Sequence, residues 1–255
     1  HRTTGTNTIT LKGNVTTPIR SPIEVTVHDM PSLFGTMLAE RLDERGIRVD
    51  SVRLATSTDP YFEGETIGPV IATPIQRVLQ RCNHDSNNLY AEALLKTLGA
   101  TYSREPGSFE NGSTVIRHAI QDQLPSPDTT LRVTDGSGMS RSNHVAPLTF
   151  ARWLASFDPN HPDDAAFIGS LPTPGEGTLS KRFRKSDLSG TTVMAKSGYL
   201  NGVCSLSGYV FAPDGRRLVF SIIVNDPRTP ASTAKLMQEK IVERLSSSLS
   251  ALARG

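Results

Sequence analysis

The chain has 255 residues, of which 36% are hydrophobic and 20% are charged, and its formal net charge is +2. These values are typical of an ordinary globular protein of one large or two modest domains, and they argue against a disordered chain or a coiled coil. No apolar run approaches the length of a membrane span, and the Lys and Arg residues form no stripe. We therefore expect neither a transmembrane segment in this chain nor nucleic-acid binding.

The N-terminal part of the chain has the pattern of a small α+β unit. A helical pattern over residues 32–46 has Ser32 as its expected N-cap and Gly46 as its end. Three β-rich stretches surround it, at residues 8–13, 23–29 and 47–55. A polar link with Pro and Gly at both ends follows. We place the boundary between two domains here, with residues 1–66 before it and residues 67–255 after it.

The middle of the chain is predicted to be helical. Proline at a first-turn position, apolar residues at helical spacing and turn residues between the segments support this prediction. The expected helices cover residues 74–82, 87–99, 113–124 and 147–157, and Asp163 and Asp164 suit the first turn of a further helix.

The last part of the chain changes to strands and then to one long helix. Strand-like runs cover residues 191–198, 204–212 and 216–225, and Pro-Asp-Gly joins the last two as a hairpin turn. The segment 232–252 reads as an amphipathic helix, with Leu236, Ile241 and Leu245 at near-helical spacing. Three antiparallel strands leave an edge that something must pair or cover.

Two short motifs carry the candidate chemistry. Ser86 and Asn88 form a Ser-x-Asn motif between two expected helices, and Lys196, Ser197 and Gly198 form a Lys-Ser-Gly motif on an expected strand. Each motif alone is common, so each is weak evidence of function. A hydroxyl, an amide and an ammonium group that converge on one cleft, however, would suit a peptide that ends in a carboxylate.

The residue types suggest a division of roles at such a cleft. Lys196 and Ser197 could bind the peptide's carboxylate, and Asn88 could hold a substrate amide. Ser86 could pass a proton toward a leaving amine. The strand's backbone could pair with an extended substrate, and the Tyr199 N–H could serve an oxyanion hole.

Neither the cysteines nor the histidines suggest a metal site. Cys82 and Cys204 are far apart and lack zinc-binding spacing, so two unpaired thiols are expected, although a disulfide stays possible. The histidines His84, His118, His144 and His161 are dispersed along the chain and lack metal-binding spacing. We predict no metal and no cofactor.

Five blocks in order give the sequence a specific resemblance. They are NNLYAEALLKTLG, TDGSGMSRSNHVAP, LPTPGEGTLSKRF, AKSGYLNGV and LSGYVFAPDGRRLVFSIIVN. Over residues 70–245 the chain resembles class C low-molecular-mass penicillin-binding proteins, the D-alanyl-D-alanine carboxypeptidase/endopeptidase family. Lys-Ser-Gly departs from the family's Lys-Thr-Gly only by exchanging one hydroxyl residue for another.

The resemblance implies both a fold and a function. The fold is the α+β penicillin-binding or serine β-lactamase-like transpeptidase fold, an antiparallel sheet flanked by a helical region, and residues 1–66 resemble the end of the family's inserted domain. The function is cleavage of peptidoglycan peptides that end in D-Ala-D-Ala through an acyl-enzyme. β-Lactam antibiotics are then expected ligands, and a periplasmic or other extracytoplasmic location in a bacterium is expected.

The family's first motif, the nucleophilic Ser-x-x-Lys, is not where the resemblance requires it. The resemblance implies that it lies upstream of His1, in a segment that would partner this chain. Residues 230–235, PASTAK, match the motif but follow the last strand, so we predict that Ser232 begins a helix and that Lys235 lies on its surface. The alternative function is a non-catalytic relative that binds cell-wall peptides or serves as a structural partner.

Overall fold

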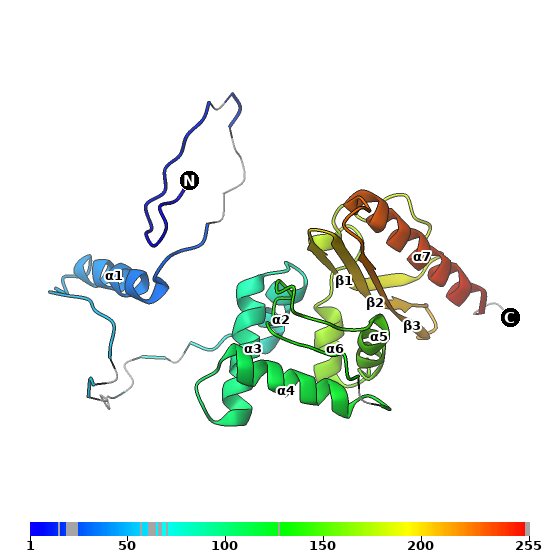
Figure 1. The fold of residues 1–255 in the computed structure, drawn as a ribbon, viewed down its shortest axis with the longest axis horizontal. Helices are drawn as coiled ribbons and strands as arrows, with labels where there is room; N and C mark the ends of the chain where they lie inside the picture. The colour runs from blue at the N-terminus through cyan, green and yellow to red at the C-terminus, as the bar shows by residue number, and fades with distance from the viewer. Residues whose placement is uncertain are drawn as a thin grey trace. The chain divides into compact units, whose positions relative to one another are not determined.

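The computed structural model of this chain describes residues 1–14, 16–18, 25–56, 58–60, 65, 68, 69, 71–126 and 128–252. The chain forms two compact units, His1–Pro69 and Val70–Gly255 (Figure 1).

The first unit contains one helix, α1 (Met30–Asp43). Its N-cap is Asp29, whose side chain accepts a hydrogen bond from the Ser32 N–H at 3.4 Å, so the prediction of Ser32 as the cap is wrong. The carboxylate of Asp29 satisfies a free N–H of the first turn, and the proline at the second helical position needs no donor there. The chain leaves the helix through Gly46, whose φ of 78° suits a glycine.

The three predicted strands of the first unit are not formed in its described residues. Residues 8–13, 25–29 and 47–55 have no strand structure, and residues 23 and 24 lie outside the described residues. Among the described residues of this unit, the only strand-like pairing is an isolated bridge between Arg2 and Ile9. A strand is stable only beside a partner, and none of these segments pairs with another. Local β-propensity alone therefore did not decide their structure.

The second unit begins with the helical region that the sequence predicted. The helices are α2 (Ile75–Asn83), α3 (Asn88–Ser103), α4 (Phe109–Asp122), α5 (Pro147–Ala155) and α6 (Pro162–Gly169). The helix α4 begins four residues before the predicted start, because Ser108 and Asn111 form a capping box. No helix in the described part of the chain is both long and apolar enough to cross a bilayer.

The sheet is antiparallel and has the order β1-β2-β3. Its strands are β1 (Thr192–Leu200), β2 (Val203–Phe211) and β3 (Arg217–Asn225), close to the predicted runs. The predicted hairpin turn between β2 and β3 is confirmed, because Gly215 takes a φ of 87° and the Ala212 N–H donates to the Arg216 carbonyl at 2.8 Å. The long helix α7 (Ala231–Leu252) follows, so the unit is α+β as expected.

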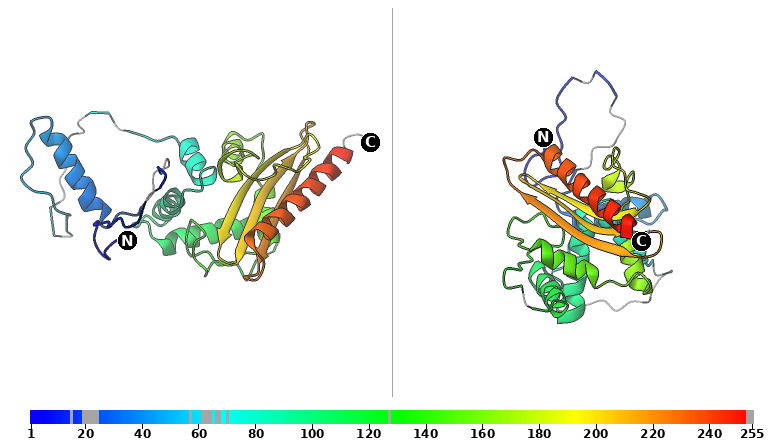
Figure 2. Two further views of the ribbon diagram at one scale, coloured as in Figure 1. Left: turned by 90° about the horizontal axis from the view of Figure 1, so that it is seen from above. Right: turned by 90° about the vertical axis from the view of Figure 1, so that its right-hand side faces the viewer.

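Each face of the sheet has its own apolar core. Figure 2 shows the sheet between α7 on one side and the helical region on the other. Val193 and Ala195 of β1 pack in the cluster that includes Val242 of α7, whereas Met194 packs with the cluster of Leu154 and its neighbours. Because strand side chains alternate between faces, Lys196 projects on the side of the helical region.

The helix α7 contacts the sheet with a face that the sequence did not predict. Its buried residues include Ala234, Gln238 and Val242, whereas Leu236 is 53% exposed and Ile241 is 37% exposed. Leu245, by contrast, packs against the core as an amphipathic helix requires. The expected apolar positions therefore divide between the two sides of the helix.

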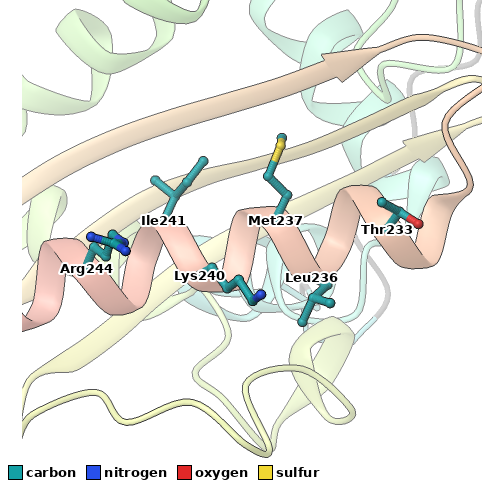
Figure 3. A pocket seen from close by; sticks show the side chains of 6 residues that line it. All are labelled: Thr233, Leu236, Met237, Lys240, Ile241 and Arg244. Carbon is teal, nitrogen blue, oxygen red and sulfur yellow. The ribbon is translucent and has the colours of Figure 1, made fainter.

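The physical reason lies in the hydrogen bonds of Gln238. Its amide donates to the Cys204 carbonyl of β2 at 3.2 Å and its side-chain oxygen accepts from Arg182 at 3.2 Å, so this polar side chain is satisfied while fully buried. Leu236 and Ile241 are thereby turned outward, where they line a shallow surface groove (Figure 3). The groove's lining is Thr233, Leu236, Met237, Lys240, Ile241 and Arg244.

Candidate active site

Ser86 lies in the short connection between α2 and α3. Its φ is +56°, a left-handed conformation that is uncommon for a residue other than glycine. The connection is held from several sides: the Asn87 N–H donates to the Arg81 carbonyl at 3.1 Å, and Arg81 pairs with Asp85 at 2.5 Å. The His84 carbonyl accepts from the Thr178 N–H at 3.2 Å. These contacts fix a strained turn that carries the Ser86 hydroxyl.

Lys196 of β1 meets this turn. Its Nζ donates to the Ser86 Oγ at 2.7 Å and to the Ser197 carbonyl at 2.8 Å. The expected closeness of the two motifs is therefore confirmed, although 110 residues separate them in sequence. An ammonium group has three donors, so these two bonds leave one for a ligand.

The environment of Lys196 is poorly solvated. Burial lowers the pKa of Lys196 from the ordinary value of a lysine, because it disfavours the charged form. Burial also raises the pKa of the Cys82 thiol on α2. The positive charge of Lys196 has the smaller, opposite effect of lowering that pKa. Cys82 and Cys204 are both free thiols, so the unpaired thiols expected from the sequence are observed.

Asn88 is the first residue of α3 and is exposed, two residues after Ser86. The helix is capped by Asn87, whose side-chain oxygen accepts from the Leu89 N–H at 3.1 Å and from the Tyr90 N–H at 3.4 Å. Because Asn87 provides the cap, the amide of Asn88 is not used for it. The described residues give Asn88 no side-chain hydrogen bond, so its amide is available to a ligand.

The outer edge of β1 carries the rest of the predicted site. The Ala195 N–H donates to the Pro172 carbonyl, outside the sheet, at 3.1 Å. Backbone groups alternate along an antiparallel strand, so the N–H and carbonyl groups of Ser197 and Tyr199 also point away from β2. This agrees with the Ser197 carbonyl accepting from Lys196. The Tyr199 N–H therefore faces the open edge, as an oxyanion donor must.

Gly198 lies close to a side chain of the neighbouring strand. A Cβ at Gly198 would lie 2.4 Å from the Ser205 Oγ of β2, so a side chain there would require the Ser205 hydroxyl to rotate away. The side chains of Ser197 and Tyr199 leave the strand on the face of α7, opposite to Lys196. The Tyr199 ring is 59% exposed, and the Lys235 Nζ lies 5.6 Å from its centroid.

The PASTAK segment does not join the candidate site. Ser232 is an exposed residue in the first turn of α7, as predicted, and α7 packs on the opposite face of the sheet from Lys196. Within the described residues, Ser232 and Lys235 form no hydrogen bond with each other, and Lys235 instead lies over the Tyr199 ring. A Ser-x-x-Lys match at a surface helix start has neither the burial nor the partner of an activated nucleophile.

One acidic residue near the site was not predicted. Glu92 of α3 accepts hydrogen bonds from Gly136 and Ser137, in the Gly- and Ser-rich block TDGSGMSRSNHVAP. The sequence holds one signal that could have found it: Glu92 follows Asn88 by four residues, so both lie on the same side of α3.

The comparisons with known proteins agree with this architecture. Residues 1–248 match the model of the D-Ala-D-Ala carboxypeptidase 3 (S13) family. The chain is 32% identical to a D-alanyl-D-alanine carboxypeptidase of Actinomadura sp. (strain R39) over 96% of this chain and 46% of that protein. It is 30% identical to penicillin-sensitive carboxypeptidase A of Dictyostelium discoideum over 84% of this chain and 42% of that protein.

A solved structure also resembles the fold. Penicillin-binding protein 4 (dacB) of Haemophilus influenzae aligns with a TM-score of 0.69 at 24% identity, over 88% of this chain and 50% of that one. The chain spans less than half the length of the curated relatives that it matches. The family match over nearly the whole sequence, together with the relative at 32% identity, shows that this chain belongs to the D-Ala-D-Ala carboxypeptidase 3 (S13) family.

Proposed function

We propose that this chain forms part of a serine-type D-Ala-D-Ala carboxypeptidase or endopeptidase that acts on peptidoglycan stem peptides through an acyl-enzyme. The observation that carries the proposal is the 2.7 Å hydrogen bond from the Lys196 Nζ to the Ser86 Oγ, beside the open edge of β1. It joins a cation, a hydroxyl and a free strand edge, which are the groups needed for an extended peptide with a terminal carboxylate.

The substrate lies along the outer edge of β1 in this proposal. Its terminal carboxylate accepts a hydrogen bond from the remaining N–H of Lys196, and the amide of Asn88 holds a substrate amide. The carbonyl oxygen under attack lies at the Tyr199 N–H, which stabilises the negative charge that develops there.

The chemical steps then follow from these positions. A serine oxygen adds to the carbonyl of the penultimate D-Ala, and the tetrahedral intermediate collapses by breaking the amide C–N bond. Ser86 gives its proton to the leaving D-Ala amine and regains one from the attacking serine, by way of that serine's partner lysine. Lys196 stays protonated throughout and keeps the Ser86 oxygen in place. Water then hydrolyses the acyl-enzyme and restores the serine.

We propose that the attacking serine comes from a Ser-x-x-Lys segment outside these 255 residues, because Ser232 lies in an exposed first turn away from Ser86. The first unit is then the end of an inserted α+β domain. Peptidoglycan lies outside the cytoplasmic membrane, so we place the activity there. The names of the relatives, which include a penicillin-sensitive carboxypeptidase, support β-lactams as ligands.

The test uses the full protein encoded with this chain. Release of D-alanine from a peptide that ends in D-Ala-D-Ala, together with an adduct of a labelled penicillin seen by intact-protein mass spectrometry, is the expected result. Lys196→Ala is expected to reduce both. Peptide binding without release of D-alanine or an adduct would instead favour the non-catalytic peptide-binding relative. Unchanged turnover in Lys196→Ala would refute the assignment of this site.

A further inference from the structure

The Glu92 carboxylate holds three donors of one loop. Its Oε2 accepts from the Gly136 N–H at 2.8 Å, and its Oε1 accepts from the Ser137 N–H at 3.2 Å and the Ser137 Oγ at 2.5 Å. Glu92 lies one helical turn after Asn88 on α3, so both side chains leave the same side of the helix. The proposed chemical steps do not use Glu92.

The loop that Glu92 holds, residues 132–144, is closed upon itself. Arg132 and His144 exchange both backbone hydrogen bonds, at 2.8 and 2.9 Å, and so join its two ends. The Asp135 carboxylate binds the interior of the loop through Gly138 N at 2.9 Å, Ser140 N at 2.5 Å and Asn143 Nδ2 at 2.7 Å. These internal bonds hold the residues of the 132–144 loop to one another, so the position of the loop depends on its contacts with other elements.

The first of these contacts is a close one with α3. A Cβ at Gly136 would lie 2.4 Å from the Ala91 carbonyl oxygen and 2.9 Å from the Leu95 Cβ. The loop backbone thus lies directly against the helix, at a distance that only glycine allows. Glu92 fixes the loop at this point, because its hydrogen bonds go to Gly136 and to the next residue.

The second contact is with the sheet. The Arg141 guanidinium donates to the Asn201 carbonyl at 2.8 Å, in the turn between β1 and β2. Asn201 follows Tyr199 by two residues. The hydrogen bonds of Glu92, the backbone and internal bonds of the 132–144 loop, and the hydrogen bond of Arg141 therefore connect Glu92 to the β1–β2 turn, two residues after Tyr199.

We propose that Glu92 is a positioning residue that fixes the open edge of β1 for an extended peptide, by way of the 132–144 loop and Arg141. The carboxylate is essential to this role because both of its oxygens accept. A glutamine would keep one acceptor and would direct its N–H groups at donors of the loop. The peptide part of this inference rests on the proposed function, whereas the mechanical connection rests on the hydrogen bonds alone.

The first experiment measures the mechanical connection without any ligand. Amide hydrogen exchange is compared in the 255-residue chain for wild type, Glu92→Gln, Arg141→Met and the control Glu105→Gln, which makes the same change at an exposed residue after α3. In Glu92→Gln, we expect exchange to rise about ten-fold or more both at Gly136 and Ser137 and in the β1–β2 turn. Arg141→Met should release the turn alone, and Glu105→Gln should change neither.

A loop that loosens in Glu92→Gln while the β1–β2 turn keeps its wild-type exchange would overturn the inference, because Glu92 would then only stabilise its own neighbours. Equal effects of Glu92→Gln and Glu105→Gln would overturn it as well. Thermal unfolding of each variant shows whether a general loss of stability explains the exchange.

The second experiment measures the affinity of the same chains for a synthetic peptide that ends in D-Ala-D-Ala, by NMR titration. We expect Lys196→Ala and Glu92→Gln each to weaken binding about ten-fold or more, and Glu105→Gln to bind as wild type does. Binding that Lys196→Ala weakens but Glu92→Gln leaves unchanged overturns the positioning role and keeps the proposed function. Binding that Lys196→Ala leaves unchanged overturns the proposed function, and the exchange experiment then decides the mechanical connection by itself.

Discussion

The substitution Lys196→Met tests the proposed site most directly. Methionine has about the length of lysine but no charge and no donor, so it can fill the same partly buried space. Lys196 uses two of its three N–H groups within the protein, on Ser86 and on the Ser197 carbonyl. The third is the one that a substrate carboxylate would accept.

The expected loss of affinity follows from that single contact. A hydrogen bond between charged groups contributes roughly 1.5–3 kcal/mol, so affinity for a peptide with a free C-terminal carboxylate should fall roughly ten- to hundred-fold. A peptide with an amidated C-terminus should bind weakly to both forms. Isothermal titration calorimetry of both peptides with wild type, Lys196→Met and the control Lys185→Met, which changes an exposed lysine, measures this difference.

The dependence on pH has a defined direction. Burial lowers the pKa of Lys196, so this ammonium loses its proton at a lower pH than an exposed lysine does. Carboxylate binding should therefore weaken as pH rises toward that lowered pKa, and Lys196→Met should not show this decline. The charged Lys196 is also a cost to folding below its folded-state pKa, so Lys196→Met should unfold at a higher temperature at neutral pH.

Two results would refute this reasoning. If Lys196→Met and Lys185→Met bind the free-carboxylate peptide equally well, Lys196 does not contact the carboxylate. If the amidated peptide binds wild type as tightly as the free acid does, the terminal carboxylate is not what the site recognises.

Three further predictions concern the rest of the second unit. Ser232→Ala should leave penicillin acylation of the full protein unchanged and should cost at most about 0.5–2 kcal/mol of stability, whereas an adduct that peptide mapping places on Ser232 would contradict its assignment as a helix start. Tyr209 is fully buried and donates to the Leu154 carbonyl at 2.7 Å, and burial raises its pKa to about 12. Because the unfolded chain loses this proton first, the free energy of unfolding should fall between about pH 10 and 12, by up to about 1.4 kcal/mol per unit. Denaturant titrations of Tyr209→Phe should lack that decline and those of the exposed Tyr102→Phe should retain it. Gly208→Ala should destabilise the sheet by about 1–3 kcal/mol, since its Cβ would lie 2.6 Å from the Ala195 Cα, and an unchanged melting temperature would show that β1 moves aside freely.

The local patterns of the second unit were enough to predict most of its elements. The strands β1 to β3 and the hairpin turn at Gly215 follow from β-rich runs separated by turn residues, and the helices follow from apolar spacing and proline positions. The start of α4 was missed because its capping box, Ser108 and Asn111, lies before the apolar residues that mark the helix. These features are local, so neighbouring residues determine them.

The strands predicted in the first unit show where local patterns fail. A β-rich sequence states that a segment can be extended, but pairing depends on a partner strand. Residues 47–55 have the expected composition, yet no strand in the part of the chain that the structure describes pairs with them. The prediction of which face of α7 packs on the sheet failed for a related reason. The spacing of apolar residues identified a helix, but the hydrogen bonds of Gln238 with Cys204 and Arg182 decided which side of that helix lies against the sheet.

The sequence by itself determined the five ordered blocks that indicated the family, and it showed Ser86, Asn88 and Lys196 in two short motifs. Only the tertiary structure decided that the Lys196 ammonium lies 2.7 Å from the Ser86 hydroxyl and that Glu92 reaches a loop more than 40 residues later in the chain. The register of β1 and the strained turn at Ser86 set the first distance, and the packing of Gly136 against α3 sets the second contact. Contacts between residues so far apart depend on how whole elements pack, and the spacing of residues along one segment does not contain that information.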